Sequence, residues 1–571
     1  MNRRKFVTIG TTTLCAIPFV GFTAFNATKD GVPVAKPKWL IDLILYNDED
    51  VKQIASYKVT DNSHKYYGGY YSDTAIPNPH TTCAFINRAC GAISCPESVY
   101  YQSAALLKDI EEALNCLLKM QHEDGTIDLL DTNFHSTPDT GFMVKRLVQS
   151  YKLLKQSNTK GYQKALQRLE QFLKNAGEAL ITGGLHTPNH RWVVSAALTK
   201  MNELSPDPRY VNRANEWLGE HIDIDPDGQY TEKSTYGYSA IIDRVLITVA
   251  KGLNKPELYD AVRKNILMMR YYIHPNGEVV TEASNRQDKG QIGTMENYYY
   301  ACRYMSLKDN DGEMASICRL IESTSFRKLV DVLNYFLEDP SLWKELPPDK
   351  ALPVSYAISF PYSGLVRIRR EIWDTTILSA NPAWLTFHKG NAVLQGMRVA
   401  ASFFGKGQFE SDDIKRIGDT WVLSKKLEGV YYQPYPKDQI SPDGDIAKMP
   451  RINRPKSNIQ YLETKISIAE ISNGISVDIE MNGTEGVPVT MELIFRKGGN
   501  FAGVQAHPTK ADAYLFSEFA GSYTVGNNTI QFGPGKLEHK GIQLRGALPA
   551  MDAPTVYLTG FTPFKHSIHL T

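Results

Sequence analysis

A polar segment that can begin a helix recurs in the first half of the chain, and this recurrence restricts the fold more than any other feature. The first copy is His135-Ser136-Thr137-Pro138-Asp139, and the second is His186-Thr187-Pro188-Asn189. In both, threonine is a good N-cap and proline a good first helical residue. Further starts, at Ser234-Thr235 and near Asn285-Arg286, follow at intervals of about fifty residues. Such a period fits one antiparallel pair of helices per repeat.

Apolar residues follow a helical period through this part of the chain. One stripe, Met143, Leu147, Tyr151 and Leu154, has spacings of four, four and three, which places its members on one face of a helix. Stacked helix pairs build an open solenoid or a closed α/α toroid, and we expect a toroid. Equivalent repeats would bring their polar starts to one end of it. The residues gathered there would be Asp139, Asn189, His190, Tyr236 and Arg286.

The pattern changes after a proline-rich stretch over residues 337–352. Short runs rich in β-branched residues then alternate with Asn-Gly and Asp-Gly turns, and helices followed by such strands argue against a parallel sheet. The runs cover residues 392–404, 460–471, 475–481, 487–495 and 529–532. We predict an α+β multidomain protein with an export signal (1–27), an N-terminal α/α toroid of helical hairpins (28–345) and a C-terminal antiparallel β-sandwich domain (346–571).

The N-terminus has the composition of an export signal. Arg3-Arg4-Lys5 resembles a twin-arginine motif, and an uncharged apolar run over 7–27 follows it. Threonines and glycines dilute this run, so export is favoured over a membrane anchor. Thr12 stands where lipoprotein signals usually carry leucine, which makes lipidation at Cys15 the less favoured alternative. We expect a periplasmic or secreted protein with no stable membrane span after signal removal.

Charge and cysteine content exclude several classes of protein. The net charge of +1 gives no support to a nucleic-acid binder, so an acidic ligand must be met by a local basic site. The spacing of the seven cysteines lacks the paired form of a structural zinc site. A loop disulfide from Cys83 to Cys90 or Cys95 and buried free thiols remain alternatives. We expect no cofactor, while a structural divalent cation such as calcium on the β domain stays open, without a loop of the EF-hand type.

The side chains at the helix starts suit β-elimination from a uronic acid. The proton on C5 of such a sugar is too weakly acidic to remove while the neighbouring carboxylate is charged. An enzyme must therefore hydrogen-bond or protonate the carboxylate. A base then takes the proton, and an acid protonates the departing C4 oxygen. Tyrosine can fill either role when nearby cations lower its pKa.

Four residues around the second helix start are candidates for this chemistry. Asn189 can donate its amide to the carboxylate, and His190 can donate as well or act as the base. Arg191 is a candidate substrate contact, although neighbours in a helix face different directions and it can equally be a surface residue. Trp192 fits core packing better than a sugar platform.

The third and fourth starts supply tyrosine and arginine. Tyr236 and Tyr238 lie two apart, so they cannot share a helix face. We expect one of them to be catalytic, with preference for Tyr238. Glu232 is a candidate for orienting it, and Arg286 is a candidate for binding the uronate and assisting the tyrosine.

Further candidate substrate contacts are spread over the chain. His135 and Asp139 belong to the first helix start. In the β domain, His388 stands in a segment that we expect to be a polar turn, from which it could reach the toroid. Tyr431 belongs to an aromatic loop able to stack on sugar rings. An ordinary turn and ordinary aromatic packing remain the alternatives for these two.

The export signal, toroid and β domain together resemble the polysaccharide lyases of the chondroitin, hyaluronate, alginate and heparinase II/III type. Those enzymes carry an asparagine early in a helix, then Asp-Gly-x-Tyr … Tyr-x-x-x-Tyr-Gly, then an arginine one repeat later. This chain has Asn189, Asp227-Gly228-Gln229-Tyr230 … Tyr236-Gly237-Tyr238, and Arg286. The resemblance implies that Asn189 neutralises the carboxylate, that Tyr238 or Tyr236 serves as acid and base, and that Arg286 assists.

This chain departs from the pattern in two respects. The tyrosines are closer together, and Glu232, Lys233 and Ser234 occupy the place of a family histidine, for which His190, His135 or His388 would have to substitute. The segment Thr187-Pro188-Asn189-His190-Arg191-Trp192 is similar to lyases that cleave L-rhamnose-α-1,4-D-glucuronate ends of arabinogalactan (polysaccharide lyase family twenty-seven). That similarity implies an exo-acting enzyme on an acidic oligo- or polysaccharide.

Two other functions fit parts of the sequence. A glycoside hydrolase on the same toroid would need two carboxylates flanking the bond, for which Asp139, Asp227 and Glu232 are candidates. A binding protein without catalysis would need no tyrosine beside a cation, so it accounts less well for the clustered residues.

Overall fold

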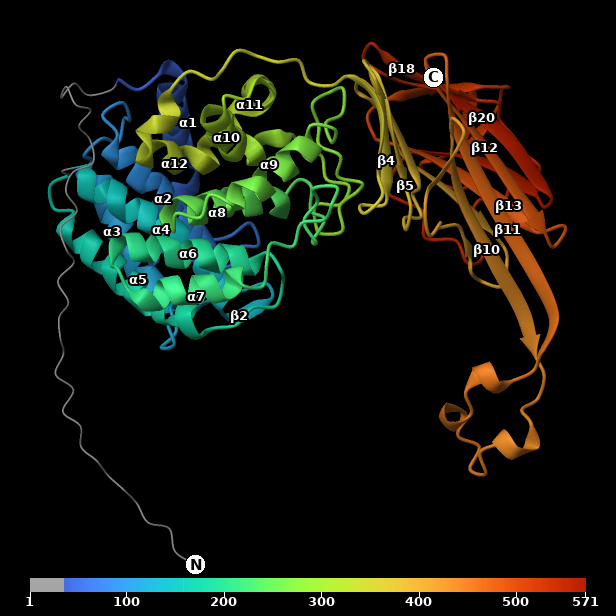
Figure 1. Ribbon diagram of the computed structural model, residues 1–571, viewed down its shortest axis with the longest axis horizontal. Coiled ribbons are helices and arrows are strands. Elements are labelled where there is room, and N and C mark those ends of the chain that lie inside the picture. The colour runs from blue at the N-terminus through green and yellow to red at the C-terminus, as the bar shows by residue number, and fades with distance from the viewer. Residues whose placement is uncertain (1–34, 158) are drawn as a thin grey trace, which may run out of the picture. The chain divides into compact units, whose positions relative to one another are not determined.

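The computed structural model describes residues 35–157 and 159–571 (Figure 1). The predicted export signal lies outside the described residues. The chain divides into two compact units. The first unit comprises Met1–Ile222, Ile242–Asp260 and Phe326–Leu346, and the second unit comprises Asp223–Ile241, Ala261–Ser325 and Pro347–Thr571.

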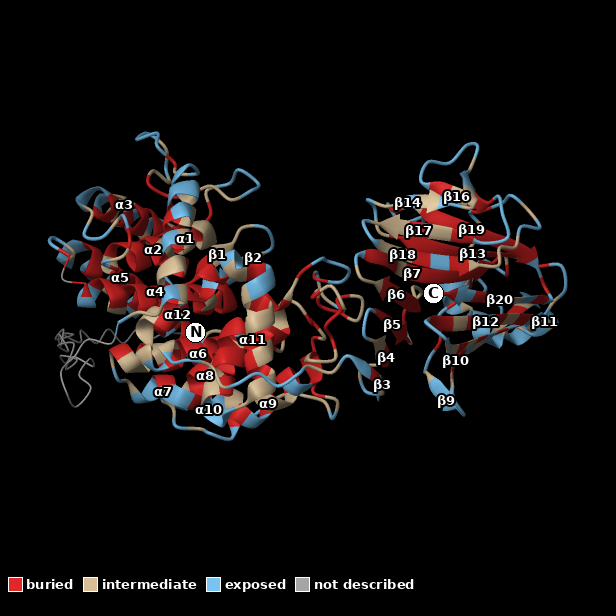
Figure 2. Ribbon diagram, turned by 90° about the horizontal axis from the view of Figure 1, so that it is seen from above, coloured by how far each residue is buried: buried red, intermediate tan, exposed pale blue. Residues whose placement is uncertain are grey.

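The first unit is built from helical hairpins. Helices α2, α4 and α6 pack side by side, and each also packs against the helix that follows it in the chain. Their inward faces form one hydrophobic core, which appears as buried residues in Figure 2. The helices are α1 (Lys38–Ala55), α2 (Pro79–Ser94), α3 (Ala104–Met120), α4 (Thr137–Gln156), α5 (Gln163–Thr182), α6 (His190–Leu204) and α7 (Pro208–Leu218).

Shorter elements complete the helical part of the chain. A small hairpin of β1 (Ile127–Leu129) and β2 (Asn133–Ser136) precedes α4, and α12 (Leu333–Glu338) packs on α1, α2 and α4. The remaining elements are α8 (Tyr238–Gly252), α9 (Leu258–Met269), η1 (Met295–Tyr298), α10 (Tyr299–Asp309), α11 (Gly312–Ser325), η2 (Phe326–Val332) and η3 (Pro340–Trp343). None of the helices within 35–157 and 159–571 is long and apolar enough to cross a membrane.

The predicted helix starts are correct in some places and wrong in others. Helix α4 begins at Thr137, but Ser136 is the cap, since its hydroxyl accepts the backbone N–H of Asp139 at 3.3 Å. Helix α6 begins three residues later than Thr187, at His190. The start predicted near Arg286 is wrong. Residues 280–294 form an irregular loop, because their backbone bonds to another loop: the N–H of Asn285 donates to the carbonyl oxygen of Lys233 at 2.8 Å.

The cysteine prediction also needs correction. Cys83 and Cys90 lie in α2 and Cys95 caps it, so they do not belong to a loop. Asn78 and Pro79 start this helix, and the Asn78 side chain accepts the N–H of His80 at 2.8 Å. The six cysteines of the described residues are free and buried, in agreement with the free-thiol alternative.

Two large sheets dominate the second unit. One has the strand order β15-β16-β19-β13-β7-β6-β5-β4-β3, with β8 beside β7, and the other has the order β14-β17-β18-β20-β12-β11-β10-β9. All pairs are antiparallel except β16 with β19. Apolar side chains from both sheets form a single core. The prediction of helices followed by antiparallel sheets is therefore confirmed, and strands that we expected from their β-branched runs are present as β7, β11, β12, β13 and β18.

The strands have the following bounds. They are β3 (Ser355–Phe360), β4 (Leu365–Arg370), β5 (Trp373–Leu378), β6 (Leu385–Lys389), β7 (Ala392–Ala401), β8 (Gly407–Gln408), β9 (Lys415–Ile417), β10 (Thr420–Tyr432), β11 (Lys456–Ile471), β12 (Gly474–Gly483), β13 (Pro488–Phe495), β14 (Asn500–Ala502), β15 (Val504–Ala506), β16 (Ala513–Phe516), β17 (Gly521–Val525), β18 (Asn528–Gly533), β19 (Thr555–Phe561) and β20 (Phe564–Leu570). Three 3-10 turns, η4 (Lys437–Gln439), η5 (Ile446–Lys448) and η6 (Arg451–Asn453), lie in the long loop between β10 and β11.

Candidate functional site

The two candidate tyrosines lie in the second unit, Tyr236 in the loop before α8 and Tyr238 at the first position of that helix. The Ser234 hydroxyl accepts the backbone N–H of Tyr238 at 2.9 Å, which starts the helix at that residue. The Thr235 carbonyl accepts the Tyr298 hydroxyl at 2.6 Å, and the Thr235 hydroxyl donates to the carbonyl of Val280 at 2.7 Å. These buried bonds hold the loop in one conformation.

Tyr236 is held by its neighbours at each polar group. Its hydroxyl donates to Oε1 of Glu296 at 2.8 Å, and its backbone N–H donates to the Asp288 carboxylate at 3.0 Å. Its carbonyl accepts the Asn297 amide at 2.8 Å. Such a side chain is positioned by the fold, with its hydroxyl proton already committed.

Tyr238 differs from Tyr236 in its hydroxyl. Both tyrosines are half-buried, but the Tyr238 hydroxyl makes no hydrogen bond with any residue that the structure describes. The Arg286 guanidinium lies 5.1 Å from the centre of its ring. Nε of Arg286 is 3.4 Å from Oε2 of Glu232, whose side chain is buried. The structure thus brings three of the predicted site residues together in the second unit: an accessible phenol, a cation and a carboxylate that orients the cation.

Asn189 and His190 lie at the start of α6 in the first unit, and both are buried. The His190 ring packs edge-on against Phe142 at 6.1 Å and His186 at 5.0 Å. Below them, Nζ of Lys145 lies 4.9 Å from the centre of the Phe142 ring. Lys145 is only 6% exposed, and none of the carboxylates described in either unit pairs with it. Burial lowers the pKa of Lys145 well below its ordinary value.

Arg191 and Trp192 have structural partners. Arg191 donates to the carbonyl of Pro188 at 3.0 Å, pairs with Glu220 at 3.2 Å and stacks on Trp192 at 4.5 Å. Trp192 is completely buried, as expected for core packing.

Of the two candidates at the first helix start, His135 lies in β2 and Asp139 in the first turn of α4. His135 is exposed, its Nδ1 is 2.7 Å from Asp124, and this hydrogen bond raises its pKa. Asp139 is buried. Burial alone would raise the pKa of Asp139, but hydrogen bonds from His80 and Ser136 lower it. The His80 Nε2 atom is 3.4 Å from Oδ1 of Asp139, which ties the first turns of α2 and α4 together.

The turn expected around His388 is wrong. His388 lies in strand β6 and is 3% exposed, because Phe387 and Lys389 continue the strand and the turn begins at Gly390. Its ring stacks on His274 with centroids 3.6 Å apart, and burial lowers its pKa. The loop expected at Tyr431 is also wrong, because Tyr431 pairs with Ser457 of β11 as the second-last residue of β10. It is 59% exposed and packs edge-on against Phe404 at 5.4 Å.

His388 belongs to a cluster with the geometry of a metal site. One ligand atom from each of His274, Asp374 and His388 lies within 4.8 Å of the others, and all three residues are buried. Nδ1 of His274 is 3.0 Å from both Asp374 oxygens. Asp374 and Glu282 raise the pKa of His274 to about 9, against the effect of burial.

The chemistry of these groups fits a zinc ion. Two imidazoles and one carboxylate are common zinc ligands, and Nδ1 of His388 is buried without a hydrogen-bond partner among the described residues. Nε2 of His274 lies 3.6 Å from Glu282, as a metal-bound histidine usually meets a carboxylate on its other nitrogen. One contact argues against a metal ion here: Arg367 already donates a hydrogen bond to the Asp374 carboxylate at 2.6 Å, so this carboxylate is not free of a partner.

Sequence reasoning missed His274, Asp374 and Lys145. The histidine and the aspartate are a hundred residues apart and belong to different elements, so no spacing connects them. For Lys145, the available signal was a lysine within the apolar stripe of a helix between Val144 and Leu147.

Comparisons with known proteins show which solved structures have a similar fold. No protein-family model matches the chain, and no curated protein matches it in sequence. Solved structures match at low identity. A Paenibacillus xanthan lyase has a TM-score of 0.55 at 10% identity, over 93% of this chain and 56% of the lyase. A Streptomyces coelicolor A3 chondroitin AC lyase has a TM-score of 0.54 at 12% identity, over 94% of this chain and 80% of the lyase.

A third match is heparinase III, with a TM-score of 0.53 at 12% identity, over 96% of this chain and 85% of the heparinase. The described chain therefore has the fold shared by these polysaccharide lyases. It spans a little over half the length of the xanthan lyase.

Proposed function

We propose that this protein is a polysaccharide lyase. It breaks the glycosidic bond at C4 of a uronic acid by β-elimination and leaves a 4,5-unsaturated uronide. The observation that carries the proposal is the Tyr238 hydroxyl, which has no hydrogen-bond partner among the described residues and belongs to a ring 5.1 Å from the Arg286 guanidinium. The shared fold supports the same reaction class. We also propose that the helices close into an α/α toroid and that the two sheets form a β-sandwich domain.

Tyrosine performs the proton transfers, and arginine binds the substrate. In the proposed reaction Tyr238 acts as the phenolate: its oxygen takes the C5 proton and becomes a hydroxyl, and the electron pair left on C5 forms the C4–C5 double bond as the C4–O bond breaks. The departing oxygen then takes a proton from a tyrosine hydroxyl. Arg286 binds the uronate carboxylate, with Glu232 holding the guanidinium in place.

Asn189 and His190 are proposed to neutralise the carboxylate. An amide and an imidazole donate hydrogen bonds that become stronger as charge develops on the carboxylate oxygens. His190 would then take the place of the histidine that the lyase pattern carries near its tyrosine.

The finer substrate proposal rests on the motif over Thr187–Trp192. Its similarity to lyases of L-rhamnose-α-1,4-D-glucuronate ends favours exo action on arabinogalactan-type glycans. His135, Asp139, Arg191, His388 and Tyr431 are proposed substrate contacts, of which His135 and Tyr431 are the exposed ones. We also propose export to the periplasm or the medium, which the mass of the mature N-terminus would test.

The decisive experiment follows ultraviolet absorbance during incubation with a panel of uronate glycans, including rhamnose-capped arabinogalactan ends. A 4,5-unsaturated uronide absorbs and a hydrolysis product does not, so growing absorbance is the expected result. Release of sugar without absorbance would overturn the lyase proposal and favour hydrolysis. In that case Asp139→Asn and Glu232→Gln should each abolish turnover, since a hydrolase needs both carboxylates.

A further inference from the structure

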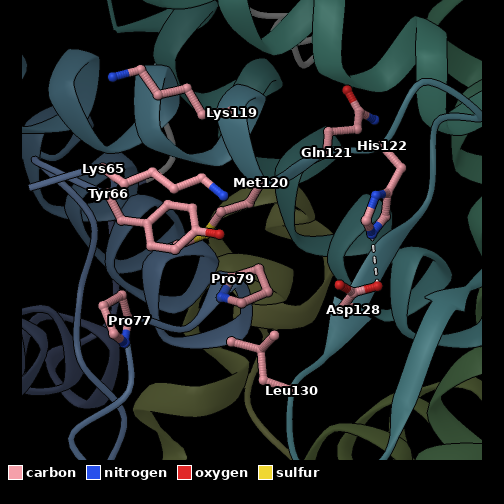
Figure 3. Close-up of a pocket in the computed structure, with 10 residues that line it drawn as sticks. All are labelled: Lys65, Tyr66, Pro77, Pro79, Lys119, Met120, Gln121, His122, Asp128 and Leu130. Atoms are coloured by element: carbon pink, nitrogen blue, oxygen red, sulfur yellow. Dashed lines mark hydrogen bonds and ion pairs between the residues drawn. The ribbon is translucent and has the colours of Figure 1, made fainter.

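A second polar site lies in the first unit, beside the start of α2 and the end of α3. A cavity of about 170 Å³ is enclosed by three segments: the loop after α1, the first turn of α2, and the stretch from the end of α3 into β1 (Figure 3). Larger cavities, of roughly 300–1,000 Å³, hold drug-sized ligands, so this one suits a single sugar ring.

The walls of the cavity have two kinds of surface. Tyr66, Pro77, Pro79, Met120 and Leu130 offer flat or apolar faces, on which the C–H face of a pyranose can pack. The polar lining residues are Lys65, Lys119, Gln121, His122 and Asp128.

The lysines of the cavity are not neutralised by the protein. Nζ of Lys65 lies 4.9 Å from the centre of the Tyr66 ring, and neither Lys65 nor Lys119 pairs with a carboxylate in the described part of the chain. Lys58, close by in the sequence, shows the contrast, since it contacts Asp109 at 2.5 Å and Glu112 at 2.6 Å.

Asp128, the carboxylate among the lining residues, is already paired, and so is Asp124 close by in the sequence. Asp128 is 2.8 Å from Nε2 of His122, and Asp124 is 2.7 Å from Nδ1 of His135. The two imidazole rings stack with centroids 3.8 Å apart. The lining therefore presents the ammonium group of Lys65, with that of Lys119 directed outward at the rim (Figure 3), and a paired carboxylate, which favours an anionic ligand.

The cavity and Asn189 lie on the same end of the first unit. Helix α2 packs on α4, and α4 packs on α6. The first turns of α2 and α4 meet at His80 and Asp139, and Phe142 of α4 meets His190 of α6. Packed helices are about 8–10 Å apart, so two such steps separate the cavity from Asn189 by on the order of 20 Å.

We propose that this cavity, with Lys65 and Lys119 at its rim, is a subsite for an acidic sugar of the substrate, remote from the sugar whose carboxylate Asn189 is proposed to bind. The proposal rests on the proposed function and extends it: the substrate is a glycan several sugars long that carries a carboxylate or sulfate away from the cleavage point. Tyr66 provides the surface on which that sugar stacks.

The first test measures the lysines themselves and needs no catalysis. The full-length protein is acetylated briefly with and without D-glucuronate, and acetylation at each lysine is quantified by peptide mass spectrometry. Lys65 and Lys119 should react about tenfold more slowly once glucuronate reaches ten times its Kd. The internal controls are the exposed lysines Lys108 and Lys174, whose rates should stay constant.

Two further probes identify the ligand class in the same assay. D-Glucose tests the need for the acid group, and inorganic sulfate tests the need for the sugar. Glucuronate protection without protection by either probe supports an acidic-sugar subsite. Equal protection by sulfate, or no protection at Lys65 and Lys119 by glucuronate, overturns the proposal.

The second test links the cavity to turnover. A Lys65→Gln/Lys119→Gln variant should raise KM for long uronate oligosaccharides about tenfold with kcat unchanged, as loss of uniform binding does, and leave KM for a disaccharide unaltered. The matched control is Lys108→Gln/Lys174→Gln, which removes the same charge elsewhere. An equal KM effect on short and long substrates would overturn the remote subsite. Lysine protection in a protein that produces no unsaturated uronide would instead count against the lyase and leave the acidic-sugar site intact.

Discussion

Two groups of charged side chains in this protein contrast in how completely their members are paired. In the first unit, Lys152 and Lys200 each contact both Glu203 and Glu338, with Lys200 3.2 Å from Glu203 and 2.9 Å from Glu338. In the second unit, Glu232 contacts Arg286 at 3.4 Å, and Arg286 lies over the half-buried ring of Tyr238.

The contrast separates a stabilising network from a reactive one. Every charge of the first group is neutralised within the group, so it can only hold α4, α6 and the end of α12 together. The second group ends in a hydroxyl that the described protein leaves without a hydrogen bond. A side chain that must exchange a proton with a ligand needs such an open position.

The largest expected effect comes from removing the open hydroxyl. We expect Tyr238→Phe to lower kcat for uronide formation by about 10²–10⁴-fold, the usual contribution of a general base, with the melting temperature unchanged. Tyr236→Phe is the matched control. Its loss of the Glu296 bond should cost about 1 kcal/mol of stability and less than about tenfold in kcat. A larger kcat loss for Tyr236→Phe would reverse the roles of the two tyrosines.

The next effect comes from opening the paired network. Glu338→Ala leaves Lys152 and Lys200 with one carboxylate between them, and breaking a buried pair costs about 3–5 kcal/mol. Chemical denaturation should show this loss, with kcat of the folded fraction unchanged. Asp42→Ala, which removes an exposed pair with Lys38, should stay within about 0.5 kcal/mol. Similar losses in both variants would mean that the network contributes no more than a surface pair.

The same network predicts a loss of stability in acid. Burial opposes ionisation of Glu338, but Lys200 and Lys152 outweigh it and lower its pKa from 4.5 to about 2. Because the folded-state pKa is the lower one, this stabilisation is present above pH 4.5 and is lost as the pH falls towards about 2. Denaturant midpoints between pH 6 and pH 2 should fall less steeply in Glu338→Gln than in the wild type. If the denaturant midpoints of the two proteins fell equally with pH, Glu338 would not be the source of the lost stability.

The smallest effect expected is that of zinc on the histidine cluster. If His274, Asp374 and His388 bind Zn²⁺, the ion at about a hundred times its Kd should raise the stability by about 2.7 kcal/mol, and a chelator should reverse the change. His388→Ala should remove the zinc-dependent part of the melting temperature. An equal zinc shift in His388→Ala would place the binding elsewhere in the chain.

Local patterns in the sequence were sufficient for the helical hairpins and the strands. The helical period predicted the helix of Met143, Leu147 and Tyr151, and the β-branched runs predicted strands such as β11 and β13, because side-chain periodicity directly reflects which face is buried. The position of Tyr238 at a helix start was also predicted. The irregular loop at Arg286 was not, since backbone bonds to the Lys233 loop replace those of a helix there.

The amino-acid sequence by itself determined the order of helices and strands and the residue types able to perform an elimination. Only the tertiary structure decided which of them meet. It separated Tyr236, bound to Glu296, from Tyr238, open beside Arg286, and it joined His274 to Asp374 across a hundred residues. The physical reason is that periodicity and capping act between neighbours in the chain, whereas burial, ion pairing and the freedom of a hydroxyl depend on residues that only folding brings into contact.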